Sequence, residues 1–174
     1  MAEPTLWWQI VHAGLKKHGV KLVAHVPDAV LTPLIKALEA DPDVDVVPLT
    51  REEEGVGILS GAYLGGQRGA LLLQSSGLGN CVNALGGLPL AYHLPFLMIV
   101  SPRGRLSEFN PSQVPAGRAA PLVLDALGIE TVELTRLDEV EKQFDAVARS
   151  CFATELPWAM VVSPVLSGGK NAQR

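Results

Sequence analysis

Apolar residues recur along the chain in two alternating patterns. Residues 6–15 carry them at helical spacing, and Gly19 then follows the basic pair Lys16 and Lys17 as a helix stop would. Residues 20–26 are apolar almost throughout, which is typical of a buried strand. Because the alternation repeats, we expect strands at 20–26, 44–49, 69–74, 95–101, 129–134 and 157–163. Helices are expected at 6–15, around 31–38, from about 52, from about 78, near 118–127 and at 137–151.

Buried strands separated by helices predict a doubly wound α/β fold, with a mainly parallel sheet and helices on both faces. The 174 residues fit one domain, which we place at 1–168 with a polar tail at 169–174. Ligands of such sheets bind beyond the carboxyl ends of the strands. The loops to search for chemistry are therefore 26–28, 50–54, 75–80 and the long polar loop 101–117.

Charge, cysteine content and hydropathy limit the partners and the cellular setting that we expect. The formal net charge is -4 and there is no basic block, so a nucleic-acid partner is not expected. Cys81 and Cys151 both fall in apolar helical patterns, which favours a reduced, cytoplasmic setting over a disulfide framework. The most apolar stretch, near 88–100, is interrupted by two prolines and a histidine, so no membrane span is expected.

Three acids and a row of glycines share the helix that begins near residue 52. Acids in a first turn are favoured by the helix dipole, and this alone accounts for one or two of Glu52, Glu53 and Glu54. Gly57, Gly61 and Gly65 would lie on one face of that helix, although glycine is a poor helix former. A bare face lets another backbone or a flat ligand approach closely, so we expect a subunit or cofactor contact there.

A second glycine motif follows the strand at 69–74. The sequence "QSSGLGNCVNAL" runs from a strand through Gly-x-Gly into a helix, which would turn backbone N–H groups toward a ligand. The third glycine and the later acidic residue of a dinucleotide site are missing. A nicotinamide or mononucleotide site is therefore not favoured.

Together, these motifs resemble a known family. The segments "REEEGVGILSGAYLGG", "QSSGLGNCVNAL", "HLPFLMIVSPRG" and "NPSQVPAGRAAPLVLDALGI" resemble the pyrimidine-binding domain of thiamine-diphosphate enzymes, in the branch of the sulfopyruvate and phosphonopyruvate decarboxylases. The similarity runs from about residue 5 to 166. It implies the thiamine-diphosphate-binding fold and carboxy-lyase activity on a 2-oxo acid.

The resemblance also implies which residues meet the cofactor. A glutamate at the entrance of the glycine-rich helix would hydrogen-bond the ring nitrogen N1′ of the aminopyrimidine. Counting back nine positions from Gly61 gives Glu52, with Glu53 as the alternative if the register slips by one. Gly77, Gly79 and Asn80 would line the pyrimidine, although Asn80 could equally be an ordinary turn or cap residue.

Substrate-binding residues are expected in the loops after the strands. Arg103 and Gln113 would hold a second anion of the substrate, because guanidinium matches sulfonate or phosphonate oxygens with a fork of donors. The alternative for Arg103 is a solvated loop charge. His25 would face the cleft, or else be a packed or solvated histidine.

The family's metal-binding motif, Gly-Asp-Gly, does not occur in this sequence. The resemblance then implies a separate beta subunit that carries the diphosphate and Mg²⁺ half of the site, in an obligate hetero-oligomer. The expected reaction converts 3-sulfopyruvate to sulfoacetaldehyde and carbon dioxide. Two alternatives stay open: a phosphonopyruvate decarboxylase subunit, and a non-catalytic subunit that keeps the fold only to bind a partner or a thiamine compound.

Overall fold

The computed structural model describes residues 5–106 and 108–169. These residues form a six-stranded sheet in which all neighbouring strands run parallel, in the order β2-β1-β3-β4-β6-β5. The predicted fold class is confirmed, and the sheet is parallel throughout. The strands are Val20–His25 (β1), Asp45–Pro48 (β2), Arg68–Gln74 (β3), Leu97–Ser101 (β4), Thr131–Leu134 (β5) and Trp158–Val162 (β6).

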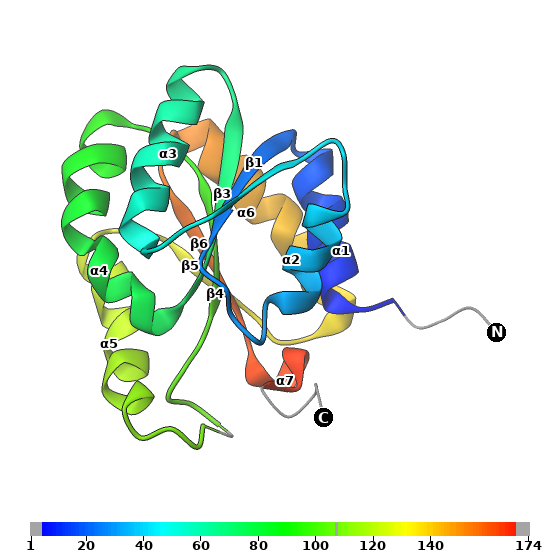
Figure 1. The fold of residues 1–174 in the computed structure, drawn as a ribbon, viewed down its shortest axis with the longest axis vertical. Coiled ribbons are helices and arrows are strands. Elements are labelled where there is room, and N and C mark those ends of the chain that lie inside the picture. Colours follow the sequence, from blue (N-terminus) through cyan, green and yellow to red (C-terminus); the bar gives the residue numbers. More distant parts are fainter. Residues whose placement is uncertain (1–4, 107, 170–174) are drawn as a thin grey trace.

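Helices cover both faces of the sheet, as Figure 1 shows. Helices α1, α2 and α6 pack on one face, and α3, α4 and α5 pack on the other. A π-helical turn, Gly86–Leu90, continues α4, and a 3₁₀ turn, Leu137–Glu139, precedes α6. The helices are Trp7–Lys17 (α1), Thr32–Glu39 (α2), Glu52–Leu64 (α3), Ser75–Leu85 (α4), Gln113–Ala126 (α5), Val140–Thr154 (α6) and Pro164–Ser167 (α7).

The core consists of one apolar layer on each face of the sheet. Successive side chains of a strand point to opposite faces. On β3, Leu72 therefore packs with α1, α2 and α6, whereas Leu71 and Leu73 pack with α3 and α4. All five residues of β4 are buried, because this central strand is covered on both sides. This double burial explains why the strands read as continuous apolar runs in the sequence.

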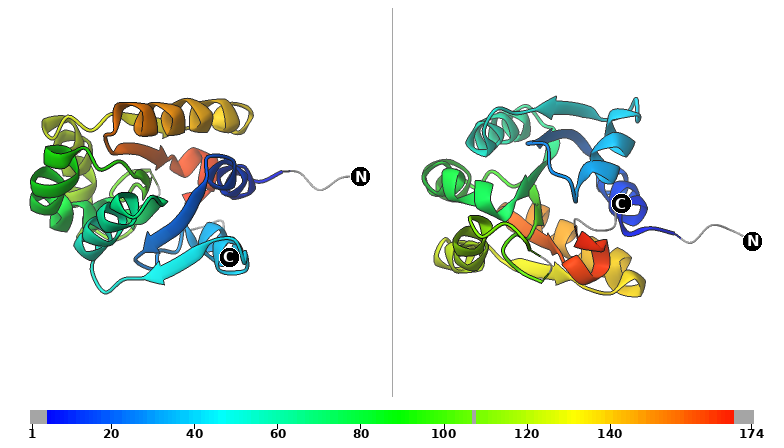
Figure 2. Two further views of the ribbon diagram at one scale, coloured as in Figure 1. Left: turned by 90° about the horizontal axis from the view of Figure 1, so that it is seen from above. Right: turned by 60° about the horizontal axis from the view of Figure 1, so that its bottom comes forward.

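Parallel strands bring their carboxyl ends to one edge of the sheet. The loops after β1 and β4 meet there, together with the first turns of α3 and α4 and the short helix α7. Figure 2 (right) turns the end of the molecule that carries α7 toward the viewer. We call this side the carboxyl edge, and it carries the residues discussed below.

Two helices begin earlier than predicted. Helix α4 starts at Ser75, directly after β3, so the expected loop 75–80 is helical. Helix α5 starts at Gln113, which shortens the expected loop 101–117 to residues 102–112. Pro115 does not prevent this, because proline is tolerated in the first helical turn, where backbone N–H groups have no intrahelical partner.

The C-terminal end was predicted less well. Helix α7 was not expected, and it begins at Pro164 with its first turn capped by the Ser163 hydroxyl, which accepts from the Val165 N–H at 3.2 Å. Of the expected polar tail, residues 170–174 lie outside the described residues. The boundary at residue 168 stays a prediction.

Packing of α1 against α6 depends on Gly14. A Cβ at this position would lie 2.5 Å from Cδ1 of Phe144. We expect Gly14→Ala to lower the free energy of unfolding by about 1–3 kcal/mol, the usual effect of overpacking a core. Gly57→Ala is the matched control, because a Cβ there meets no atom within 4 Å. That variant should gain about 0.5–1 kcal/mol from helix propensity. Urea titrations would measure both, and equal effects would contradict the packing described.

Candidate functional site

Glu52 is the first residue of α3, and its side chain turns inward at the carboxyl edge. The residue is only 6% exposed. Its carboxylate lies against the backbone of Gly77 in the first turn of α4, where any Cβ would overlap it. Among the described residues, no hydrogen-bond or ion-pair partner is found for this carboxylate. The carboxylate oxygens are not fully enclosed, so they keep some contact with solvent. A mostly buried carboxylate that reaches the surface without a protein partner is typical of a site that binds a ligand.

The two neighbouring glutamates have local partners. Glu54 accepts a hydrogen bond from the Thr50 N–H at 3.1 Å, and so closes the turn before the helix. Glu53 pairs with Arg51 at 3.2 Å on the surface, and its side chain is 42% exposed. Of the three acids, Glu52 is the one whose burial has no structural explanation. This geometry favours Glu52 over the alternative Glu53.

The predicted glycine motif lies in a helix and not in a loop. Gly77 is buried beneath Glu52, whereas Gly79 and Asn80 are exposed on α4. A Cβ at Gly79 would meet no atom within 4 Å. The structure therefore brings Gly77 together with Glu52, and it leaves Gly79 and Asn80 on the outer surface of the helix.

Cys81 lies one turn further along α4. Its thiol donates to the Gly77 carbonyl at 3.6 Å. Burial, with the charges of Glu52 and Glu53 nearby, raises the pKa of Cys81 to about 12. The thiol therefore stays protonated at neutral pH and is not a candidate nucleophile.

Arg103 follows β4 and is buried, with 7% of its surface exposed. The alternative of a solvated loop charge is therefore wrong. Its Nη1 donates to Gln74 Oε1 at 2.8 Å, and its Nε donates to Glu108 Oε2 at 2.8 Å. Its backbone N–H donates to the Ser75 hydroxyl, also at 2.8 Å. Arg103 thus binds its own loop to the end of β3 and the start of α4.

Glu108 is the main counter-ion of Arg103. Besides the guanidinium, its carboxylate accepts from the backbone N–H groups of Gly104 at 3.3 Å and Asn110 at 3.0 Å. The Arg103 guanidinium, aided by these N–H groups, lowers the pKa of the Glu108 carboxyl to about 2. Asp28, in the loop after β1, lies 3.9 Å from Arg103 Nη1. Two acids therefore flank one guanidinium.

Glycines allow this loop to lie against α5. Gly104 has φ +68, and a Cβ there would lie 2.6 Å from Val114 Cα. A Cβ at Gly117 would overlap the Arg103 carbonyl. Gln113, the first residue of α5, has a buried Oε1 without a hydrogen-bond partner among the described residues. The residues not predicted as site residues are Asp28, Gln74, Ser75 and Glu108. In the sequence, Gln74 is marked only as the polar end of a predicted strand, and the other three only by loop polarity.

His25 does not face the same side of the sheet as Glu52. It follows Ala24, which packs with α3, so alternation along β1 turns His25 toward α2. It is 3% exposed, and neither ring nitrogen has a hydrogen-bond partner among the described residues. His25 is thus packed on the α2 face of the sheet, and its expected contact with the substrate stays a prediction.

No group of three or more metal-ligating side chains forms a metal centre within residues 5–106 and 108–169. In that part of the chain, no helix has the length and apolar character to cross a membrane.

The contact between Glu52 and Gly77 can be tested by a double-mutant cycle. Gly77→Ala should lower the free energy of unfolding by about 1–3 kcal/mol, because the added methyl group overlaps the carboxylate. In a Glu52→Ala background the same change should cost little, since the carboxylate is gone. Gly79→Ala serves as the stability control on the same helix. Equal losses in both backgrounds would show that Glu52 does not lie on Gly77.

Acid should destabilise the protein through His25. Burial lowers the pKa of His25 below its ordinary value, and Glu39 only partly offsets this effect. The folded state therefore favours the neutral ring, and this stability is complete above about pH 6.5 and lost as the pH falls toward the lowered pKa. We expect urea titrations at pH 7.5 and 5.5 to show a smaller loss in His25→Phe than in the unmodified protein. His93→Gln, at an exposed histidine, should leave the loss unchanged.

Comparison with known proteins agrees with the geometry. Residues 8–110 match the family model described as thiamine pyrophosphate enzyme, N-terminal TPP binding domain. In structure, the chain is similar to a 2-oxoglutarate:ferredoxin oxidoreductase from Magnetococcus marinus, with a TM-score of 0.72 and 13% identity. The match covers 94% of this chain and 29% of that one. At this identity the likeness shows the fold alone.

Curated relatives share much more of the sequence. Sulfopyruvate decarboxylase subunit alpha from Methanococcus maripaludis is 38% identical over 88% of this chain and 92% of that protein. The subunit of the same name from Methanothermobacter thermautotrophicus is 46% identical over 70% of this chain and 73% of that protein. Phosphonopyruvate decarboxylase from Streptomyces viridochromogenes is 36% identical over 86% of this chain and 38% of that protein. The chain belongs to the thiamine pyrophosphate enzyme family, as a relative of the sulfopyruvate decarboxylase alpha subunits.

Proposed function

We propose that the chain is the pyrimidine-binding subunit of a thiamine-diphosphate-dependent decarboxylase, which converts 3-sulfopyruvate to sulfoacetaldehyde and carbon dioxide. The observation that carries this proposal is the buried carboxylate of Glu52, which lies at the carboxyl edge without a protein partner. Its geometry fits the cofactor. A pyrimidine ring nitrogen is the kind of group that an unpartnered carboxyl needs, because the two can share one proton.

Three structural features suit Glu52 to share that proton. It lies in the first turn of α3, where the helix dipole favours the negative charge that remains when the proton moves to the ring. Most of its side chain is shielded from water, which strengthens a hydrogen bond to a bound ligand. Gly77 has no side chain, so the carboxylate can lie close to α4. When bound, thiamine diphosphate supplies the electron sink that decarboxylation of a 2-oxo acid requires.

The substrate assignment depends on the second anionic group. Arg103 lies beside the same end of β3 as Glu52, through its bonds to Gln74 and Ser75. A guanidinium there could bind a sulfonate, with Gln113 as a further polar group from the start of α5. Phosphonopyruvate stays the alternative substrate, since both groups are tetrahedral oxyanions. The subunits named for sulfopyruvate cover nearly the same length as this chain, and this favours sulfopyruvate.

A partner subunit should supply the rest of the site. The described residues contain no metal centre, and the sequence lacks Gly-Asp-Gly. The phosphonopyruvate decarboxylase relative is far longer than this chain, which spans 38% of it, whereas the relatives named subunit alpha are not. We therefore assign Mg²⁺ and the cofactor's diphosphate to a separate beta subunit. The assembly belongs in the cytoplasm, which suits the two buried, free cysteines.

The outer surface of α3 and α4 fits such a partner. Positions 57, 61, 79 and 87 are glycines at which a Cβ would meet no atom within 4 Å. Exposed apolar residues lie between them, and Arg68 is the single Asp, Glu, Lys or Arg between positions 55 and 102 of the sequence. An apolar surface without charges is typical of the core of a protein interface. The exposed apolar residues are Ile58, Leu64, Val82 and Tyr92.

Replacement of Glu52 by glutamine tests the proposal. Glutamine keeps the size of the side chain but cannot take up and return the proton. We expect Glu52→Gln to lower decarboxylation of 3-sulfopyruvate by about 10²–10⁴-fold, the usual contribution of a general acid or base. Carbon dioxide release would be measured in the complex with the beta subunit, thiamine diphosphate and Mg²⁺.

Two neighbouring acids provide the controls. Glu53→Gln and Glu54→Gln remove the same charge from the same helical turn, but their carboxylates pair with Arg51 and Thr50. Both variants should keep most of the activity. If Glu52→Gln retained full turnover in an intact complex, the proposed function of Glu52 would be wrong. A complex that bound thiamine diphosphate but released no carbon dioxide from any 2-oxo acid would favour a non-catalytic subunit.

A further inference from the structure

Arg103 already holds an anion of its own protein. A guanidinium has five N–H groups. The Glu108 carboxylate accepts hydrogen bonds from Nε at 2.8 Å and from Nη2 at 3.4 Å. Gln74 Oε1 accepts one from Nη1 at 2.8 Å. Glu108 binds through the same side-on fork that a sulfonate or phosphonate would use. The proposed anion ligand of the substrate is therefore occupied by an internal carboxylate.

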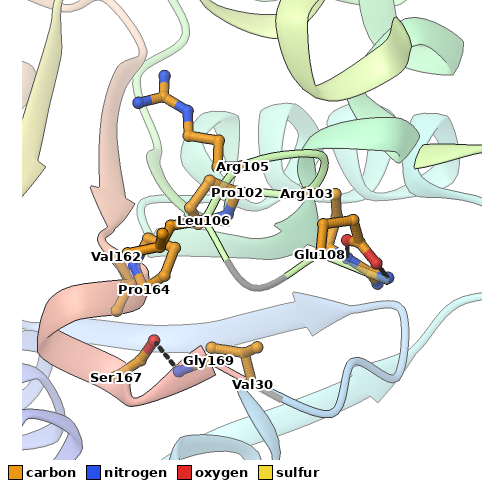
Figure 3. Close-up of a pocket in the computed structure, with 10 residues that line it drawn as sticks. All are labelled: Val30, Pro102, Arg103, Arg105, Leu106, Glu108, Val162, Pro164, Ser167 and Gly169. Carbon is orange, nitrogen blue, oxygen red and sulfur yellow. Dashed lines mark hydrogen bonds and ion pairs between the residues drawn. The ribbon is translucent and has the colours of Figure 1, made fainter. Parts of the chain in front are cut away.

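There is little free space beside this pair. Arg103 and Glu108 line a cavity of about 20 Å³ that also contacts Val30, Pro102 and Leu106. Such a volume holds about one water molecule and no larger group. Figure 3 shows the two side chains together, with Arg105 pointing away from them. Because this cavity is too small for a sulfonate, a substrate sulfonate can use the same fork of donors only if the Glu108 carboxylate moves away.

The pair lies close to Glu52 in the fold. Gln74 and Ser75, which bond Arg103, immediately precede the turn of α4 that contains Gly77. Gln74 alternates with Leu73 along β3, so its side chain lies on the α2 face, whereas Glu52 reaches the same strand end from the α3 face. A ligand that contacts Glu52 at this strand end therefore lies near the loop that carries Glu108.

We propose that Glu108 is an exchangeable internal counter-anion that selects substrates with a second anionic group. In the absence of substrate Glu108 neutralises Arg103, and a sulfonate or phosphonate then replaces it. This inference rests on the proposed function, because it takes Arg103 as the substrate's anion ligand. Glu108 is thus a specificity-determining residue for a reaction in which Glu52 does the proton chemistry.

Charge balance favours an exchange over simple addition. A buried guanidinium without an anion is strongly unfavourable, so Arg103 needs a counter-ion at every stage. Asp28, at 3.9 Å from Nη1, compensates it only in part. Replacement of one anion by another keeps the buried charge constant. A 2-oxo acid without a second anionic group, such as pyruvate, has no sulfonate or phosphonate to replace Glu108. Glu108 then stays bound to Arg103.

Kinetics of the holoenzyme complex test the exchange. Removal of the competing carboxylate in Glu108→Gln should lower KM for 3-sulfopyruvate about tenfold, equivalent to about 1.4 kcal/mol. KM for pyruvate should not change, and Arg103→Gln should raise KM for 3-sulfopyruvate. Glu108→Asp is the second variant, because it keeps the charge but shortens the reach to the fork. Glu141→Gln, at an exposed position on α6, controls for loss of one negative charge.

A binding measurement separates this inference from the proposed function. 3-Sulfopropanoate carries a sulfonate and a carboxylate but no ketone, so calorimetry on the complex reports anion binding without turnover. We expect tighter binding in Glu108→Gln and Glu108→Asp, and none in Arg103→Gln. If the complex decarboxylates no 2-oxo acid, the proposed function fails while this titration still decides the exchange. Weaker binding or a higher KM in both Glu108 variants would overturn it, because Glu108 would then position Arg103 for the substrate.

Discussion

The carboxylate of Glu52 lies against the backbone of Gly77, and this contact sets the geometry of the carboxyl edge. It joins the first turns of α3 and α4, two helices on the same face of the sheet. Glycine is required at position 77 because any Cβ would occupy the space of the carboxylate. The contact also explains why an acid that is buried at the start of a helix is not simply a cap. Its neighbour Glu54 is exposed, and it accepts a hydrogen bond from the Thr50 N–H just before the helix.

A second set of contacts reaches the same strand end from the other face. Arg103 binds Gln74 and Ser75, and Glu108 closes the loop around its guanidinium. The parallel sheet makes this convergence possible, since the ends of β1, β3 and β4 lie side by side. The side chains of Glu52 and Arg103 thus approach the end of β3 from opposite faces of the sheet. The proposed function places one ligand across this strand end.

The sheet and its covering helices could be predicted from the sequence. The features that could not be predicted depend on tertiary contacts. Buried strands and amphipathic helices predicted the sheet and its layers, because the apolar pattern follows from burial on both faces. The start of α4 was missed, since Ser-Ser-Gly-Leu-Gly-Asn has the composition of a loop. In the fold, Gly77 of this first turn packs against Glu52 of another helix, a contact that the local sequence does not reveal. The side of the sheet that His25 faces follows from alternation only once the covering helices are known.

Glu52 and Arg103, two of the buried charged residues at the edge, differ in their partners. Arg103 was expected to bind an anion of the substrate. In the structure its guanidinium already donates hydrogen bonds to Glu108 and Gln74. That pairing is visible only in three dimensions, because the loop brings Glu108 back onto Arg103. Glu52 has no such partner among the described residues, although both residues are similarly buried. The protein thus supplies an acid that neutralises Arg103, but it supplies no partner for Glu52 among the described residues. Under the proposed function, a cofactor would add an interaction at the unpaired carboxylate, whereas a substrate anion would have to replace one at the paired guanidinium.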